Sequence, residues 1–183
     1  MGMNHKSILI LVLIFNAFSF NSWAVAKSSV AIKQRSDQWL NKDGAVRGGV
    51  ASGYMSLFDV RKSASAKLKT ERLVLDWGDA YGRPSPKSGY YQVEYQAQMH
   101  RVIINLALTL NSKVDGRALT DRLSKGLYIK TARLEFDSMG QAQNLVLDLK
   151  KTVRVRVASY PSQMPQGNIQ RNIPARLVVD LVE

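Results

Sequence analysis

Histidine and cysteine, which carry much of the catalytic and metal-binding chemistry of proteins, are almost missing from this chain. It contains two histidines, His5 and His100, and no cysteine. His5 lies in an N-terminal leader, and a zinc site needs several ligands, which His100 alone cannot provide. No nucleophile-elbow sequence accompanies His100, so we expect an ordinary surface or edge histidine. These residues predict neither a metal site nor nucleophilic catalysis.

Carboxylates offer the remaining route to hydrolysis, as a general acid paired with a general base. The candidates lie at the ends of expected strands, where charge favours solubility and protects strand edges. They are Asp76, Asp79, Glu94, Asp137 and Asp148. The glycines at 48 and 49 lack the spacing and the following helix of a nucleotide-binding loop. We therefore predict that the protein is not an enzyme and uses no cofactor.

Arginine and tyrosine side chains are better suited to binding. Arg154 and Arg156 project from one face of an expected strand, and guanidinium groups bind carboxylates through paired hydrogen bonds. Further arginines recur at strand starts and would extend this basic surface, while exposed tyrosines near a proline-rich turn would stack on sugar rings. The candidate ligand-binding residues are Arg72, Tyr81, Tyr90, Arg101, Arg133, Arg154, Arg156 and Arg176.

The same residues also have a structural interpretation. An Arg-x-x-x-Asp pattern in neighbouring strands favours ladders of cross-strand ion pairs. Trp77, Tyr91 and Tyr95 share the phase of the apolar side chains, so we expect them in the core.

Short apolar segments organise the chain into strands. Four of them are Arg72-Leu-Val-Leu-Asp76-Trp77, Arg101-Val-Ile-Ile-Asn105-Leu106, Asn144-Leu-Val-Leu-Asp148-Leu149 and Arg176-Leu-Val-Val-Asp180-Leu181. Side chains alternate along a strand, so Leu177, Val179 and Leu181 share one face. Each of the four strands offers such an apolar face to a common core.

The strands from residue 54 onward form two equivalent halves, 54–110 and 127–183. Setting Arg72 over Asn144 places Arg61 on Arg133 without a gap. Each half follows the same order of four strands, which predicts two symmetrical antiparallel sheets packed as a sandwich. A closed barrel would satisfy the same alternation.

Other segments connect or precede these halves. Residues 115–125 predict a short helix with Asp115 as its N-cap, Leu119 and Leu123 on one face, and Gly126 as its stop. Residues 27–53 are polar and basic and predict an extended lead-in, with a turn or two of helix over 34–40.

Residues 1–26 predict a secretory signal peptide. A weakly positive start precedes the apolar run 8–20, and Ala24-Val25-Ala26 fits a cleavage site, with Ser22-Trp23-Ala24 as the alternative site. An uncleaved N-terminal anchor is the alternative. No later stretch is long enough to span a membrane. The formal charge of +12 is spread along the chain, which favours polyanions of the cell envelope as partners over nucleic acid.

The doubled unit resembles the AMIN domain, and the segments 144–149, 153–157 and 174–181 carry the resemblance, which covers 54–183. AMIN domains precede periplasmic N-acetylmuramoyl-L-alanine amidases and the secretins of pilus and secretion machines. The resemblance implies two small symmetrical β-sheets and peptidoglycan binding in the periplasm. Asn105 and Asn144 depart from the charged residues of the family's strand motif.

Three functions follow as expectations. The first is a non-catalytic, periplasmic protein that binds peptidoglycan. The second is an adaptor of an envelope machine, such as a pilus or secretion secretin, that pairs through an exposed strand edge. The third is a regulator of a separate cell-wall amidase.

Overall fold

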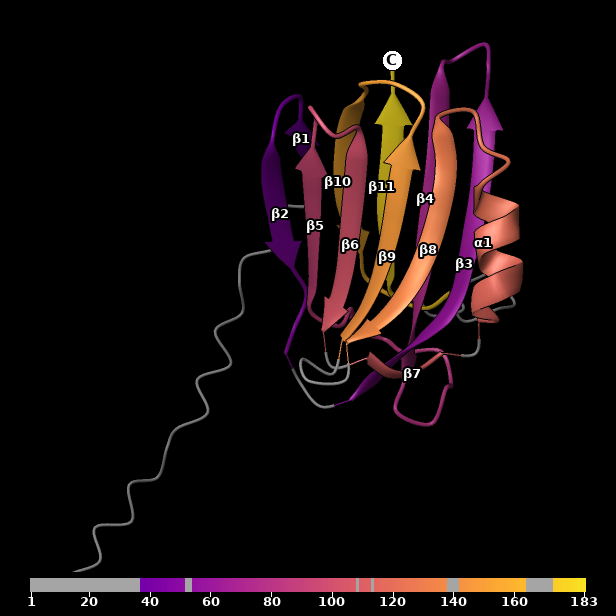
Figure 1. Ribbon diagram of the computed structural model, residues 1–183. Coiled ribbons are helices and arrows are strands. Elements are labelled where there is room, and N and C mark those ends of the chain that lie inside the picture. Colours follow the sequence, from indigo (N-terminus) through magenta and orange to yellow (C-terminus); the bar gives the residue numbers. More distant parts are fainter. Residues whose placement is uncertain (1–36, 52–53, 108, 113, 138–141, 164–172) are drawn as a thin grey trace, which may run out of the picture.

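The computed structural model describes residues 37–51, 54–107, 109–112, 114–137, 142–163 and 173–183. Two β-sheets pack face to face in this part of the chain, as predicted (Figure 1). The predicted signal peptide lies outside the described residues.

The first sheet has the strand order β1-β10-β11-β4-β3-β7. Its strands are β1 (Gln38–Leu40), β10 (Arg154–Tyr160), β11 (Arg176–Val182), β4 (Thr70–Asp79), β3 (Met55–Ser65) and β7 (Thr109–Ser112). The second sheet has the order β2-β5-β6-β9-β8. Its strands are β2 (Gly44–Gly48), β5 (Tyr91–Gln96), β6 (Arg101–Ala107), β9 (Ala142–Leu149) and β8 (Ile129–Asp137). All pairings are antiparallel except that of β3 with β7.

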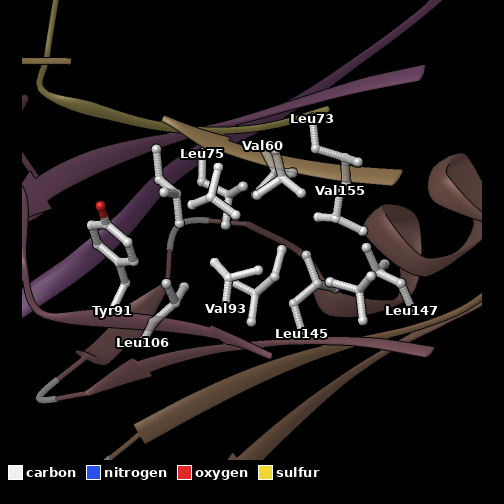
Figure 2. Packing of buried hydrophobic residues seen from close by; sticks show 14 of the residues in the cluster. Val60, Leu73, Leu75, Tyr91, Val93, Leu106, Leu145, Leu147 and Val155 are labelled. Carbon is white, nitrogen blue, oxygen red and sulfur yellow. The ribbon is translucent and has the colours of Figure 1, made fainter. Parts of the chain in front are cut away.

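The core lies between the sheets, and the alternation of the sequence decides which side chains enter it. Leu177, Val179 and Leu181 are all fully buried, which confirms the face predicted for this strand. Figure 2 shows side chains of the first sheet meeting those of the second in the space between them. Trp77, Tyr91 and Tyr95 are also core residues, as expected. The hydroxyl of Tyr95 accepts a hydrogen bond from the backbone N–H of Val153 (3.1 Å), which satisfies its polar end.

The strand order is the same in the two sheets when β10, β11, β4 and β3 are set against β5, β6, β9 and β8. Each half of the chain contributes one hairpin to each sheet. The internal sequence repeat itself stays a prediction, because only the strand order is seen here.

Two segments differ from the sequence expectation. Residues 38–40, expected in a turn or two of helix over 34–40, are instead the strand β1, and 44–48, expected in an extended lead-in, are the strand β2. The two strands lie at the edges of the two sheets. Three residues are too few to show the alternation of apolar and polar side chains that marks a strand. In Gly44–Gly48 the glycines at both ends have no side chain, so the buried Val46 does not form part of a visible alternation. The strand predicted from Arg101 to Leu106 is β6, and the residues shortly after it, Thr109–Ser112, pair with the first sheet as β7.

The predicted helix is α1 (Gly116–Leu123), and Asp115 caps it by accepting from the backbone N–H groups of Arg117 and Ala118. Leu119 and Leu123 are buried, as predicted. The loop after the helix is held by the fully buried Glu71, whose Oε2 accepts from the backbone N–H groups of Tyr128 (2.7 Å) and Ile129 (3.2 Å).

Gly126 lies in this loop against the carboxylate of Glu71. A Cβ at position 126 would come within 2.1 Å of Glu71 Oε1. Any larger side chain at position 126 would collide with the Glu71 carboxylate, so this position requires glycine.

Candidate ligand-binding surface

A row of side chains crosses the outer face of the first sheet through direct cross-strand neighbours. Trp39 of β1 lies opposite Arg156 of β10, Arg156 opposite Asp180 of β11, and Asp180 opposite Arg72 of β4. Arg72 donates from Nε and Nη2 to the two oxygens of Asp180 (2.6 and 2.9 Å). Asp180 is only 3% exposed, and Nη1 of Arg156 lies 3.7 Å from its Oδ2. The row is thus built on a buried carboxylate between two guanidinium groups.

The indole of Trp39 lies at one end of this row and is exposed. The guanidinium carbons of Arg154 and Arg156 lie 5.4 and 5.8 Å from the ring centroid, within the range of cation–π attraction. Arg156 also donates to both carboxylate oxygens of Asp37 (2.7 and 2.6 Å). These hydrogen bonds lower the pKa of Asp37. Trp39 remains 47% exposed, so part of its ring is open to a ligand.

A groove of about 450 Å³ runs along this row toward the turn between β3 and β4. Its lining comprises Trp39, Ser63, Ala64, Ser65, Leu68, Thr70, Arg72, Arg156, Asp180 and Val182. We call it the arginine–tryptophan groove. Its charged groups suit carboxylates, and its open indole suits a sugar ring or another flat apolar group.

A second arginine–aromatic pair lies further along the same outer face. Arg176 lies over the ring of Tyr160 (5.6 Å), although Asp76 is its direct cross-strand neighbour. Asp76 instead accepts from Arg61 Nη2 (2.9 and 2.7 Å). Burial raises the pKa of Asp76 despite the opposing effect of Arg61. The face therefore presents aromatic rings with guanidinium groups above them at two places.

Arg101 and Arg133 do not extend this surface, because they lie on the outer face of the opposite sheet. Both donate to Asp148, at 2.7 Å each, and Thr131 donates to it at 2.9 Å. Burial opposes the ionisation of Asp148, but these hydrogen bonds outweigh it and lower its pKa to about 2. Arg101 and Arg133 therefore form cross-strand ion pairs, which is the structural alternative considered for these arginines in the sequence analysis.

The second sheet also differs at the positions that match the Arg72–Asp180 pair. There the side chains are amides, and Asn105 Nδ2 donates to Asn144 Oδ1 (2.7 Å). The outer faces of the two sheets therefore share strand order but present different chemistry.

Tyr81 and Tyr90 lie between β4 and β5, at the far end of β4 from the arginine–tryptophan groove. Tyr81 is 81% exposed, and the guanidinium of Arg83 lies 5.2 Å from its ring centroid. Tyr90 is half-buried where β5 begins. Of the sequence-predicted residues, the structure therefore brings together Arg72, Arg154 and Arg156, with Arg176 on the same face.

Trp39 and Tyr160 were not among the predicted residues. Tyr160 is in phase with Arg154 and Arg156, so the alternation of β10 already placed it on their face. Trp39 gave a weaker signal, because its strand is three residues long and its position depends on pairing with the distant β10.

A scan against protein-family models and a search of curated proteins found no match to this chain. Within the described ranges, no group of three or more histidine, aspartate or glutamate side chains is arranged to hold a metal ion. No helix in the described part of the chain has both the length and the apolar character to cross a membrane.

Proposed function

We propose that this protein is a non-catalytic, periplasmic component of the cell envelope that binds peptidoglycan through the arginine–tryptophan groove. The observation that carries the proposal is the exposed Trp39 ring flanked by Arg154 and Arg156, beside the buried Asp180. Peptidoglycan combines sugar rings with peptide carboxylates, so it matches both kinds of group in one ligand. The resemblance of residues 54–183 to AMIN domains supports the same partner.

The arginines in the groove, Arg72 and Arg156, and Arg154 beside it on the Trp39 ring, differ in how much hydrogen bonding they have left for a ligand. Arg72 is occupied by Asp180, and Arg156 by Asp37. Arg154 is exposed, and it donates a long hydrogen bond from Nη2 to the backbone oxygen of Glu183 (3.3 Å). We therefore assign Arg154 the main contact with a stem-peptide carboxylate, and Arg72 the role of fixing the floor of the groove.

The test is retention of the chain from Lys27 onward on purified insoluble sacculi, at low and near-physiological salt. The expected result is retention at both salts, reduced at least tenfold by Arg154→Ala together with Arg156→Ala, and also by Trp39→Ala, which leaves the charge unchanged. A tenfold loss corresponds to about 1.4 kcal/mol, a modest share of what paired charged hydrogen bonds contribute.

The matched control removes two positive charges elsewhere, by Lys87→Gln with Arg117→Gln, both at exposed positions. This variant should be retained like the unmodified chain. Equal losses from both double variants, or release on raising salt in step with an unrelated basic protein, would leave only bulk charge at work and overturn the proposal.

A second candidate function is that of an adaptor in an envelope machine such as a pilus or secretion secretin. A regulator that binds a separate cell-wall amidase would use the same kind of contact. The observation in its favour is that β2 pairs only with β5 among the described strands and so presents a free edge for strand addition. A proline in place of Ala45 or Arg47 should then abolish capture of the partner while sacculus retention is unchanged.

A further inference from the structure

Exposed lysines gather at one end of the sandwich, the end that lies at the top of Figure 1. Five turns meet there with the end of β11: residues 41–43, 66–69, 97–100, 124–128 and 150–153. We call this surface the basic end. Its exposed lysines are Lys42, Lys67, Lys69, Lys125, Lys130, Lys150 and Lys151. The carboxylate side chains in these turns and at the end of β11 are Asp43 and Glu183.

Hydrogen bonds join these turns into one continuous surface. The backbone N–H of Glu183 donates to the carbonyl of Lys69, and Lys151 Nζ donates to the Glu183 carboxylate (2.5 Å). The N–H of Leu149 donates to the carbonyl of His100, and Lys150 donates to the loop after α1, from Nζ to the Gly126 carbonyl.

The turn between β1 and β2 joins the same surface through one side chain. Asp43 Oδ1 accepts from the N–H of Ala97 (2.6 Å). The lysines on these turns are therefore held close together by the fold.

The lysines of the basic end differ from the arginines of the sheet faces in their partners. On the sheet faces, most arginines described above pair with aspartates. At the basic end, Lys42, Lys67, Lys125 and Lys130 form no ion pair with any carboxylate in the described part of the chain. Lys69 and Lys151 share a single partner, Glu183. The basic end thus has an uncompensated positive charge.

Two apolar side chains project from this charged surface. Leu68 is 70% exposed and Met99 is 68% exposed, each at the tip of a hairpin. The hairpins share one geometry, because the residue after each tip, Lys69 (φ 49°) or His100 (φ 50°), has left-handed backbone. Left-handed backbone costs a non-glycine residue about 1 kcal/mol. The chain nonetheless has a lysine, Lys69, at one of these positions and a histidine, His100, at the other.

We propose that the basic end docks on the surface of a lipid bilayer that contains anionic headgroups. The lysines would contact lipid phosphates, while Leu68 and Met99 would enter the boundary between headgroups and acyl chains. Long lysine side chains suit this boundary, since the ammonium group stays in water. In this orientation the strands stand upright on the bilayer and the outer faces of both sheets face sideways. Leu68 belongs to both surfaces, because it also lines one end of the arginine–tryptophan groove, whereas Trp39 and Arg156 lie on the outer face of the first sheet and face sideways. The inference does not rest on the proposed wall binding.

The test is co-sedimentation of the chain from Lys27 onward with vesicles of phosphatidylglycerol and phosphatidylethanolamine, against vesicles of phosphatidylcholine alone. Binding should require phosphatidylglycerol. Lys67→Gln with Lys125→Gln should weaken it about 30-fold, since each basic residue near an anionic leaflet contributes about fivefold. Met99→Ser, with unchanged charge, should weaken it about fivefold.

The matched control is again Lys87→Gln with Arg117→Gln, which should weaken vesicle binding by less than about threefold. Equal losses from the two double variants, or equal binding to both kinds of vesicle, would overturn the proposal. Inorganic phosphate at low millimolar concentration should not release the protein, and release would assign the basic end to free phosphate instead.

Sacculus retention separates the two proposals. Lys67→Gln with Lys125→Gln should keep full retention on sacculi while losing vesicle binding. Loss on sacculi with vesicle binding intact would assign the lysines to the wall and overturn the bilayer proposal.

Discussion

At the scale of single residues, Asp76 and Asp148 show how burial and the number of guanidinium partners together decide the pKa of a carboxylate. They occupy matching positions in β4 and β9. Asp148 accepts from two arginines and a threonine, and its pKa falls to about 2 from an ordinary value of 3.8. Asp76 hydrogen-bonds with Arg61, and burial raises its pKa. Ionisation of Asp148 therefore stabilises the fold, whereas ionisation of Asp76 opposes it.

This difference predicts a dependence of stability on pH. A carboxyl group whose pKa is lowered by folding stabilises the fold above its unfolded pKa and loses that effect as it is protonated. Asp148→Asn should therefore lower the free energy of unfolding by about 2 kcal/mol at pH 7. The difference from the unmodified protein should shrink as the pH falls from about 4 to about 2. Urea unfolding at a series of pH values measures it.

Asp76→Asn is the matched comparison. Because folding raises the pKa of Asp76, its ionisation opposes folding, and this effect is present above that pKa. Asp76→Asn should consequently cost less stability at pH 7 than Asp148→Asn. The reverse order would contradict the account given for both sites.

Arg72 in the groove and Arg154 beside it should separate stability from binding. Arg72→Ala leaves the buried Asp180 without its bidentate partner and should lower the free energy of unfolding by about 3 kcal/mol. Arg154→Ala changes an exposed side chain and should alter stability by less than about 0.5 kcal/mol while reducing sacculus retention. Chemical unfolding and retention, measured on both variants, test this division of roles.

At the scale of elements, Glu71 connects β4 to the loop between α1 and β8. Glu71→Ala would leave the N–H groups of Tyr128 and Ile129 buried without acceptors, at a cost of about 3 kcal/mol. Hydrogen exchange of these two amides should accelerate more than exchange of the amides of β11. The amides of β11 serve as the reference, because they do not donate to the Glu71 carboxylate. Uniform acceleration would instead indicate loss of global stability alone.

The two hairpin tips predict a trade between stability and binding. Lys69→Gly removes the penalty of left-handed backbone and should raise the free energy of unfolding by about 0.5–1 kcal/mol. It also removes one charge of the basic end, so affinity for anionic vesicles should fall about fivefold. Thermal unfolding and co-sedimentation of the same sample measure both effects. A gain in stability without loss of vesicle binding would remove Lys69 from the docking surface.

At the scale of the whole molecule, the sequence predicted the sandwich because its signal is periodic. Leu73, Leu75 and Trp77 form a wholly apolar set on one face, while the other face carries Arg72 and Asp76, and such alternation decides which face is buried whatever the partner strand. The helix could be predicted for a similar reason. Its N-cap Asp115 and its buried leucines at 119 and 123 lie within the helix or next to it, so the signal does not depend on distant strands.

The site was predicted only in part, because its composition depends on which strands become neighbours. Arg72 and Arg101 have the same sequence context, but one faces Asp180 on the first sheet and the other Asp148 on the second. Trp39 reaches the groove only through the pairing of β1 with β10, more than a hundred residues away. Nothing in the local pattern of three residues specifies such a partner.

The unequal burial of two tryptophans gives the protein an intrinsic optical reporter. Removal of the predicted leader, which holds Trp23, leaves Trp39 at 47% exposure and Trp77 at 1%. A soluble quencher such as acrylamide should therefore reach the indole in the groove and not the one in the core. A ligand seated in the groove would suppress that quenching, whereas unfolding would extend it to both indoles. Emission intensity thus distinguishes occupancy from loss of structure in a single unlabelled sample.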